Sequence, residues 1–311
     1  GRVDSDSIDA ALDAALDGEG TRLASAGDLA DAFRNARVIT AEYSADLALH
    51  AAIEPQTATA SYADGRLTLW VPTQAPALAR AAAAAVTGLA ETEIIVHPMM
   101  AGGSFGGKLE HQVVEQVALL AHRLGRPIQL TWSRSETCLH DRYRPPARAR
   151  MSARLDRNGQ VRGWLAKIAA PSTGAMLARR LLLNDVAAAA GLAVGAGDPV
   201  AIAGAEPIYA IPDYAVDHHP AEIGVPTGHW RSGAHSYTAF FNECFLDELA
   251  QMAGVEAHSF RIAMLGGRPR MARCLSTVAA LGGWQGGVPG SGQGLACHAM
   301  PSRAVSMRIA S

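Results

Sequence analysis

A glycine loop and two distant polar residues carry the strongest potential for chemistry in this chain. The loop is Gly102-Gly-Ser-Phe-Gly-Gly-Lys108, in which four glycines surround one aromatic residue, Phe105. Glycine lets the backbone approach a ligand closely and adopt positive φ angles, so N–H groups in such a loop can face an anionic ligand. Two polar side chains, Gln74 and Arg231, stand beside turns elsewhere in the sequence. The pattern favours a loop that a cofactor approaches, with Phe105 closing one wall of the site.

The glycine loop has two other interpretations. Gly102 to Lys108 satisfies Gly-x-x-x-x-Gly-Lys, which is most of a phosphate-binding P-loop. A P-loop needs Ser or Thr at the next position to ligate magnesium, whereas this chain has Leu109, and Phe105 would crowd the phosphates. Nucleotide binding is therefore disfavoured. A purely structural glycine turn stays open as an alternative.

Gln74 and Arg231 each have a functional and a structural interpretation. Gln74 lies between an expected strand end and a helix that opens with proline, so its amide can face a cleft. As a structural residue it would cap the helix or stabilise the turn. Arg231 follows a Gly- and Pro-containing loop, and its planar guanidinium suits carboxylate, phosphate or carbonyl oxygens. Its structural alternative is a surface salt bridge.

No protein-ligated metal site is predicted. The chain has 11 histidines and four cysteines, but none of them forms a zinc spacing such as His-x-x-x-His or Cys-x-x-Cys. Catalytic triads also lack support in the sequence. The candidate site residues therefore include no metal ligand.

The candidate residues stand at junctions between expected elements. Apolar residues over 93–97 predict a strand directly before the glycine loop, and the spacing over 110–125 predicts an amphipathic helix after it. Gln74 stands in the same way between a predicted hairpin and a helix over 76–88. Both junctions would place backbone N–H groups and side chains at the end of a strand.

Hairpins and helices alternate irregularly along the chain. Regular strand–helix–strand units are few, which favours the α+β class, with hairpins, a mixed sheet and packed helices, over a doubly wound parallel sheet. Asn158-Gly159 predicts a two-residue hairpin turn. The remaining patterns predict helices over 8–16, after Asp28, in part of 172–200, and over 237–254, 256–265 and 270–283, and strands over 37–43, 57–62, 66–71, 127–133, 148–156, 160–171 and 214–225.

Length and composition limit the possible functions. The chain has 311 residues, of which 49% are hydrophobic and 18% charged, and this suffices for a sizeable core. A net charge of −2 and the lack of a basic stripe disfavour nucleic-acid binding. The sequence has no run of 18 apolar residues, so no membrane span is expected. Cytoplasmic and periplasmic locations both stay open.

At the candidate site residues, the sequence resembles the large molybdenum-cofactor subunit of the xanthine dehydrogenase/aldehyde oxidase family. The similarity is greatest to the branch of the isoquinoline 1-oxidoreductase β-subunit and aldehyde dehydrogenase. Seven blocks in family order carry the resemblance, which covers roughly residues 26–285. The blocks are His50-Ala-Ala-Ile-Glu54-Pro, Trp70-Val-Pro-Thr-Gln74, Gly102-Gly-Ser-Phe-Gly-Gly107, Gly125-Arg-Pro-Ile-Gln-Leu-Thr-Trp-Ser-Arg-Ser-Glu136, Asp141-Arg-Tyr-Arg-Pro145, Pro226-Thr-Gly-His-Trp-Arg231-Ser and Phe245-Leu-Asp-Glu-Leu-Ala250.

The resemblance implies the first molybdenum-cofactor-binding domain of a molybdenum hydroxylase, and it implies roles for the residues above. Molybdenum would be held by a pterin, as molybdopterin or its cytosine dinucleotide, and not by side chains. Gln74 would hydrogen-bond an oxygen on molybdenum, and Arg231 would stabilise negative charge on the substrate oxygen. The backbone of the glycine loop would line the cofactor, which gives the cofactor-binding residues Gly102, Gly103, Phe105, Gly106 and Gly107.

The implied reaction is hydroxylation of an aldehyde or an aromatic N-heterocycle, with water as the oxygen source. Two electrons would leave through iron–sulfur clusters that belong to a partner subunit. Xanthine-type members carry an acidic residue directly after Gly-Gly-Lys. Leu109 occupies that position here, which disfavours a purine-like substrate.

The resemblance also implies a domain organisation. Residues 1–25 would form a helix and linker, 26–285 the molybdopterin-binding domain, and 286–311 a linker and the truncated start of a second cofactor-binding domain. The family carries a general-base Glu near the C-terminus of a longer chain, and no counterpart is found in these 311 residues. The chain would therefore need the remainder of its own subunit. The alternative function is a catalytically inactive, cofactor-free fragment or a partner-docking domain.

Overall fold

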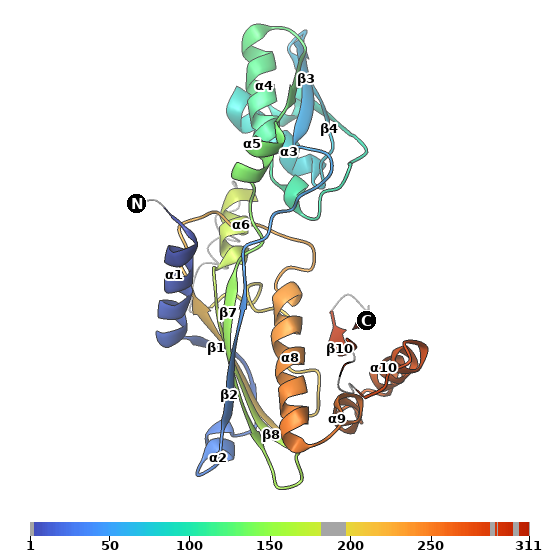
Figure 1. The fold of residues 1–311 in the computed structure, drawn as a ribbon. Coiled ribbons are helices and arrows are strands. Elements are labelled where there is room, and N and C mark those ends of the chain that lie inside the picture. Colours follow the sequence, from blue (N-terminus) through green and yellow to red (C-terminus); the bar gives the residue numbers. More distant parts are fainter. Residues whose placement is uncertain (1–2, 182–196, 287–289, 291, 301–304, 311) are drawn as a thin grey trace.

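The computed structural model of the protein describes residues 3–181, 197–286, 290, 292–300 and 305–310. The chain forms two lobes, each built on its own sheet (Figure 1). Residues 57–139 make up the small lobe at the top of Figure 1. The large lobe contains a long five-stranded sheet between helices. Two connecting segments, 46–56 and 140–146, carry the chain into the small lobe and back out again.

Helices and strands alternate along both lobes. The helices are α1 Ser5–Asp17, α2 Leu29–Phe33, α3 Pro76–Thr87, η1 Glu91–Glu93, η2 Gly107–Leu109, α4 Gln112–Leu124, α5 Arg134–Leu139, α6 Thr173–Leu181, α8 His235–Ala253, α9 Ala257–Met264 and α10 Pro269–Leu281. The strands are β1 Thr21–Ala26, β2 Ile39–Ala45, β3 Thr57–Ala63, β4 Arg66–Val71, β5 Ile94–Pro98, β6 Ile128–Thr131, β7 Ala147–Leu155, β8 Val161–Ala170, β9 Asp213–Pro220, β10 Gly294–Ala299 and β11 Val305–Ala310.

The large lobe is a mixed sheet covered on both faces. Its strand order is β1-β9-β8-β7-β2, and only the β8–β9 pair is parallel. Helix α8 packs on one face through Tyr237, Phe241 and Phe245, and Trp164 of β8 is buried beneath it. Helix α1 covers the other face through an apolar stripe, Ile8, Leu12 and Leu16 (Figure 1). The i, i+4, i+8 spacing of that stripe is the helical repeat that buries one side of a helix.

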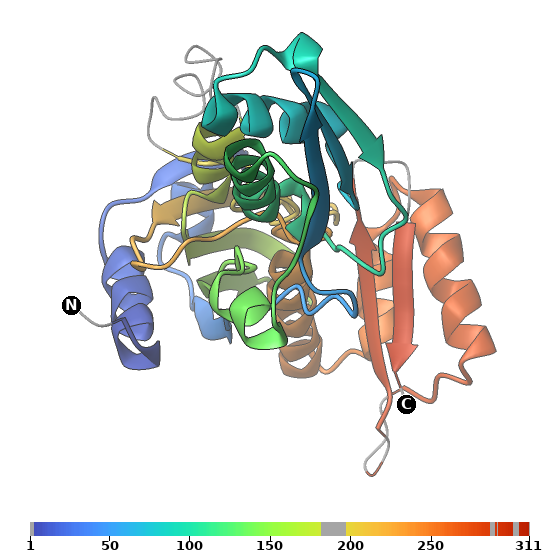
Figure 2. The same ribbon diagram turned by 90° about the horizontal axis from the view of Figure 1, so that it is seen from above.

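The small lobe is a second mixed sheet with helices on one face. Its order is β5-β4-β3-β6, with β4 and β5 parallel and the other pairs antiparallel. Helices α3 and α4 supply the apolar residues that pack on the buried side of β3 and β4. Gly88 and Gly125 end these helices with φ of +75° and +58°, the left-handed conformation that glycine tolerates best. The ends of β4 and β5 therefore lie side by side in this lobe (Figure 2).

The predicted α+β class is confirmed, together with the hairpins, the mixed sheets and the packed helices. The β7–β8 hairpin is also confirmed, but its turn differs. Asp156 donates its N–H to the carbonyl of Gln160, and only Gly159 of the central residues has positive φ, at +76°. A two-residue type I′ turn needs positive φ at both central positions, so the prediction of that turn was wrong.

Several elements were not predicted or begin elsewhere. Strand β1 pairs with β9 in the segment expected to be a linker, and short helix α5 follows the predicted strand over 127–133. Strand β9 ends at Pro220, five residues before the predicted strand end. Strand β10 pairs with β11 and places Leu295 and Cys297 in the core of the large lobe. The part of the 172–200 prediction that falls on 182–196 lies outside the described residues.

Candidate functional site

The glycine loop lies where the small lobe meets the large one. Strand β5 leads into it, and the 3-10 turn η2 follows it. Three of its residues have positive φ, because Gly103, Phe105 and Gly106 have φ of +97°, +52° and +110°. Only glycine adopts the conformation of Gly106 without strain, and a positive φ at Phe105 is unusual for a bulky residue. The loop is therefore held by its neighbours and not by its own preference.

The neighbour that holds the loop is the segment before helix α8. A Cβ atom on Gly106 would lie 1.8 Å from the carbonyl oxygen of His229, so glycine is required for this approach. The backbone N–H of Arg231 donates to the carbonyl of Phe105 at 2.7 Å. The guanidinium carbon of Arg231 lies 5.3 Å from the centroid of the Phe105 ring, within cation–π range. The structure therefore brings together two predicted parts of the site that are far apart in sequence.

Gln74 flanks the other end of the loop. Its backbone N–H donates to the carbonyl of Lys108 at 3.0 Å, and it lies between β4 and α3 as predicted. Its side chain does not cap α3, because the N-cap is Ala75 and Thr73 supplies the nearby hydroxyl contact. Gln74 is exposed, and its amide has no protein partner among the described residues. Gln74 is therefore not a helix cap.

Arg231 is likewise not engaged in the way its structural alternative requires. It is exposed and forms no salt bridge within the part of the chain that the structure describes. Four successive backbone N–H groups, those of Gly103, Ser104, Phe105 and Gly106, also find no acceptor among the described residues. Unpaired N–H groups of successive residues that differ in the sign of φ can together bind an anion. Together with the Gln74 amide and the Arg231 guanidinium, they form a set of polar groups that a ligand can engage.

The structure also tests the P-loop interpretation of Gly102–Lys108. The Lys108 side chain is 3% exposed, and its Nζ lies 2.7 Å from the Glu54 carboxylate. Glu54 also accepts a hydrogen bond from the backbone N–H of Gly102 at 3.1 Å. Helix α4 begins only at Gln112, after the 3-10 turn. In a P-loop the lysine reaches the phosphates and the helix follows at once, so this geometry is not that of a P-loop.

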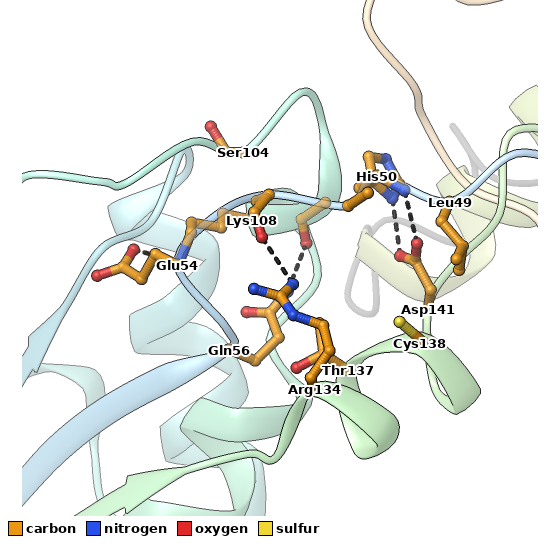
Figure 3. A pocket seen from close by; sticks show the side chains of 13 residues that line it. Leu49, His50, Glu54, Gln56, Ser104, Lys108, Arg134, Thr137, Cys138 and Asp141 are labelled. Atoms are coloured by element: carbon orange, nitrogen blue, oxygen red, sulfur yellow. Dashed lines mark hydrogen bonds and ion pairs between the residues drawn. The ribbon is translucent and has the colours of Figure 1, made fainter.

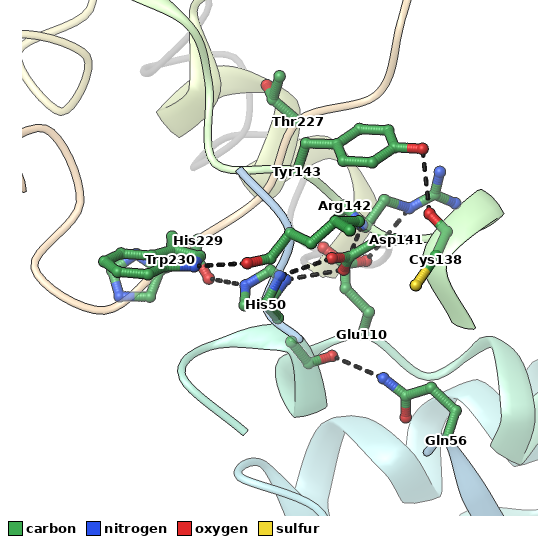
Figure 4. Close-up of polar contacts among 12 residues, drawn as sticks. His50, Gln56, Glu110, Cys138, Asp141, Arg142, Tyr143, Thr227, His229 and Trp230 are labelled. Atoms are coloured by element: carbon green, nitrogen blue, oxygen red, sulfur yellow. Dashed lines mark hydrogen bonds and ion pairs between the residues drawn. The ribbon is translucent and has the colours of Figure 1, made fainter. Parts of the chain in front are cut away.

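One ion pair that sequence reasoning did not assign lies directly behind the loop (Figure 4). His50 Nδ1 lies 2.7 Å from Asp141 Oδ1, and His50 Nε2 lies 3.0 Å from the His229 carbonyl oxygen. Both residues come from blocks that carried the family resemblance, but neither block gave them a role. The sequence feature that could have pointed to this pair is the presence of a His and an Asp in the two connecting segments. Contact between those segments could not be read from spacing.

A second cluster surrounds Glu110. Arg180 donates to both oxygens of this carboxylate, at 2.7 and 3.2 Å, and Arg142 Nε lies 3.9 Å away. The Glu110 side chain is 10% exposed, so its carboxylate interacts with these cations and hardly with solvent. Arg180 also donates to the carbonyl of Thr227 at 2.8 Å. The cluster ties helix α6 to the glycine loop and to the segment that carries Arg231.

A small cavity is lined by the His50–Asp141 pair and by the Lys108–Glu54 pair (Figure 3). Its volume is about 20 Å³, which is room for roughly one water molecule. Arg134 reaches across it and donates to the carbonyls of Ala52 and Ile53 at 2.7 and 2.6 Å. The cavity is too small for an organic substrate. The polar groups around it therefore support the loop, while the ligand side of the loop is its exposed face.

Sequence comparison defines the family. The family described as "Molybdopterin cofactor-binding domain" matches residues 16–265. The chain belongs to this family. Its molybdopterin-binding domain is 26% identical over 262 residues to the β-subunit of isoquinoline 1-oxidoreductase from Brevundimonas diminuta, covering 84% of this chain and 32% of that protein. It is 27% identical over 243 residues to a nicotinate dehydrogenase subunit from Pseudomonas putida, covering 76% of this chain and 20% of that protein.

Solved structures share the fold of this molybdopterin-binding domain. Quinoline 2-oxidoreductase from Pseudomonas putida 86 superposes with a TM-score of 0.70 at 19% identity, covering 92% of this chain and 40% of that one. Aldehyde oxidoreductase from Desulfovibrio gigas gives 0.64 at 17% identity, covering 84% and 30%. The chain thus spans about a third or less of the curated relatives' length.

Two further observations bear on ligands. No three His, Cys, Asp or Glu side chains gather within metal-binding distance among the described residues. Across the same residues, no helix combines the length and apolar character needed to cross a membrane. A molybdopterin brings its own sulfur ligands for the metal, so a protein that holds it needs hydrogen-bond donors more than side-chain ligands. The unpaired N–H groups of the loop and the partner-free amide and guanidinium beside it fit such a group.

Proposed function

We propose that this chain is the cofactor-binding part of a molybdenum hydroxylase, which oxidises an aldehyde or an aromatic N-heterocycle with water as the oxygen source. The observation that carries the proposal is the convergence of three separate segments at the glycine loop. The glycine loop offers unpaired N–H groups, Gln74 lies beside Lys108 at the end of the loop, and Arg231 lies beside Phe105 in its middle. Sequence membership in the molybdopterin-binding family supplies the cofactor class.

When bound, the molybdenum–pterin group supplies two-electron redox chemistry and an oxygen that comes from water. The chain's own residues position that group and the substrate. The loop N–H groups would hold the anionic atoms of that group, and the Gln74 amide would donate a hydrogen bond to it. The Arg231 guanidinium offers positive charge where negative charge develops on the substrate oxygen, which stabilises the transition state more than the ground state. Phe105 restricts Arg231 to one side of the loop through the 5.3 Å ring contact.

The substrate class follows from the acidic group near the loop, which other side chains already engage. Glu110 is the acidic residue nearest the end of the loop, and Arg180 and Arg142 already neutralise it. Leu109 presents no carboxylate at the position before it. A substrate that needs an acid to recognise a purine edge therefore finds none here. The names of the relatives, which point to isoquinoline, nicotinate or aldehydes as substrates, support an aromatic N-heterocycle or an aldehyde.

Other protein parts are proposed to complete the site. Ile53 and Met100 flank the loop and are 90% and 94% exposed, which suits burial against the remainder of the same subunit. Residues 26–285 would form the cofactor-binding unit and 286–311 the start of the next one. An iron–sulfur subunit would accept the electrons. The cofactor would be molybdopterin or its cytosine dinucleotide.

The experiment that tests the proposal is substrate-dependent reduction of a dye by the natural protein, purified from its own host. Benzaldehyde and isoquinoline serve as the two probes, and xanthine serves as the comparison substrate. We expect turnover of at least one probe, loss of activity in tungstate-grown cells, and at most weak turnover of xanthine. Activity that survives replacement of molybdate by tungstate would refute the proposal.

The second candidate is a cofactor-free domain that only docks a partner. The exposed apolar side chains of Ile53 and Met100 favour it, because docking alone would need them. It predicts no molybdenum and no pterin in the purified protein, whereas the proposed function predicts both.

A further inference from the structure

His50 lies at the point where three segments of the chain meet. It belongs to the connecting segment 46–56, and its partner Asp141 belongs to the other connecting segment, 140–146. The backbone N–H of His50 donates to Asp141 Oδ2 at 2.8 Å, so the two segments are tied twice. The side chains of His50 and Asp141 are 5% and 9% exposed. This pair therefore sits out of reach of bulk water.

Both ring nitrogens of His50 face hydrogen-bond acceptors. Nδ1 faces a carboxylate oxygen of Asp141, and Nε2 faces the His229 carbonyl, which cannot donate (Figure 4). A neutral imidazole carries one N–H and one lone pair, so it satisfies only one of the two contacts. The imidazolium donates from both nitrogens and satisfies both. Because a buried lone pair facing an oxygen is costly, the geometry selects the charged form.

Another buried histidine in the same chain shows the opposite arrangement. His218 Nδ1 accepts from the backbone N–H of Asp198 at 3.0 Å, while Nε2 donates to the carbonyl of Ala170 at 3.0 Å. One acceptor and one donor suit the neutral ring. Burial accordingly lowers the pKa of His218. The two histidines differ in their partners and not in their depth.

We propose that His50 is a positioning residue that stays protonated at neutral pH and holds the Arg231 segment against the glycine loop. This role rests on the proposed function, because the segment that His50 positions carries Arg231, the residue proposed to act on the substrate oxygen. The His229 carbonyl that accepts from His50 is the same atom that a Cβ on Gly106 would meet at 1.8 Å. One hydrogen bond from a fixed cation therefore sets how closely the two halves of the site approach.

The charged groups around His50 agree with a retained proton. Burial lowers the pKa of His50. The hydrogen bond and charge of Asp141, the His229 carbonyl and the charge of Glu110 raise this pKa by more than burial lowers it, so the net shift is upward. By comparison, burial and then the His50 charge lower the pKa of the His229 ring. The other charged groups that line the adjacent cavity are Lys108, which Glu54 neutralises, and Arg134, which binds two carbonyls.

Deprotonation would act on one contact first. The Nδ1–H stays with the Asp141 carboxylate, and Nε2 then turns a lone pair toward the His229 carbonyl oxygen. The two atoms repel, and the segment that carries Arg231 loses its anchor. Because the pKa of His50 is raised, this loss occurs as the pH rises through that folded-state value, and the contact is complete below about pH 6.5, the ordinary histidine value.

The direct test is neutron diffraction from deuterated crystals of the natural protein at pH 7. We expect deuterium on both ring nitrogens of His50 and on Nε2 alone of His218, which serves as an internal reference in the same crystal. Deuterium on a single nitrogen of His50 would overturn the proposal. This readout does not depend on catalysis, so it stands even if the protein proves to have no molybdenum-dependent activity.

The functional test is the pH profile of kcat/KM for the holoenzyme. Wild type should lose activity on the alkaline side, Asp141→Asn should move that limb to lower pH, and His50→Gln should abolish the limb while lowering kcat/KM about 10- to 100-fold. His218→Gln is the matched control for removing a buried ring. A merely structural role for His50 predicts lower activity in Asp141→Asn with an unmoved limb, and that result would refute the positioning role.

Discussion

The guanidinium of Arg231 lies over the ring of Phe105, and the backbone N–H of the same arginine donates to the Phe105 carbonyl at 2.7 Å. Two contacts thus join residues separated by more than a hundred positions. Phe105 adopts φ of +52° to make them. The guanidinium carries five N–H donors, and Arg231 is exposed, so an anionic or carbonyl oxygen can reach it. This relationship underlies the first prediction.

Replacing Arg231 by alanine should lower kcat/KM about 100- to 1000-fold, the loss typical of removing one donor from a developing oxyanion. The melting temperature should stay within experimental error, because Arg231 is exposed and forms no salt bridge with the described residues. Steady-state kinetics of the holoenzyme and a thermal melt measure both. Arg162→Ala, which removes an exposed arginine at the start of β8, is the matched control. Equal kinetics in both variants would remove Arg231 from the site.

Gln74→Ala should lower turnover about 10- to 100-fold, as loss of a hydrogen bond to a metal-bound group typically does. The fold should persist, because the backbone N–H that contacts Lys108 is unchanged and the side chain has no protein partner among the described residues. Activity per bound molybdenum is the appropriate measurement. Gln129→Ala on strand β6 removes another exposed amide and should behave as wild type. Wild-type turnover in Gln74→Ala would contradict the assigned role.

Gly106→Ala should destabilise the protein by at least about 3 kcal/mol, because a methyl group at φ of +110° meets the His229 carbonyl at 1.8 Å. Gly125→Ala separates the two causes. It has φ of +58° with open space around the new methyl group, so only conformational strain of about 1 kcal/mol applies. Urea unfolding of both variants measures the difference. Equal destabilisation would mean that the loop and the Arg231 segment are not in close contact.

Glu256 gives a prediction for acid stability. It caps helix α9 by accepting from the backbone N–H groups of His258 and Ser259, and it also accepts from Trp284 Nε1 at 2.6 Å. Burial raises its pKa, but these hydrogen bonds outweigh burial and bring the pKa to about 2. Since the folded-state pKa is lowered, this stabilisation is present above about pH 4.5 and is lost as the pH falls towards 2.

Glu256→Gln should therefore cost about 1 kcal/mol at pH 7, the usual effect of weakening an N-cap. The difference between variant and wild type should shrink as the pH is lowered from about 4.5 to 2. Urea unfolding across this pH range measures it. Glu222→Gln changes an exposed carboxylate and serves as control. A difference that does not change with pH would show that the Glu256 charge does not stabilise the helix.

The elements of the small lobe could be predicted from local sequence because each is defined by nearby residues. Apolar spacing marks α4, Pro76 marks the start of α3, and Gly125 marks a helix end. Strand β1 could not be predicted in this way. Its burial is only intermediate, and its stability comes from pairing with β9, almost two hundred residues later. Pairing over such a distance leaves no local pattern.

The site residues also differ in whether nearby sequence marks them. Glycine spacing marked the loop, and motif order marked Gln74 and Arg231. The roles of His50 and Glu110 depend on which residues face them. His50 is defined by two acceptors from distant segments, and Glu110 by the approach of Arg180. Those contacts arise only once the two lobes are folded together, so residue type alone could not reveal them.

The most direct test of the account is the molybdenum and pterin content of the natural protein, purified from its own host grown with molybdate. Inductively coupled plasma mass spectrometry measures the metal, and fluorescence of the oxidised pterin measures the organic part. The account predicts about one molybdenum and one pterin per chain, since one glycine loop serves one cofactor. A folded protein that turns over an aldehyde or N-heterocycle while containing neither would contradict it.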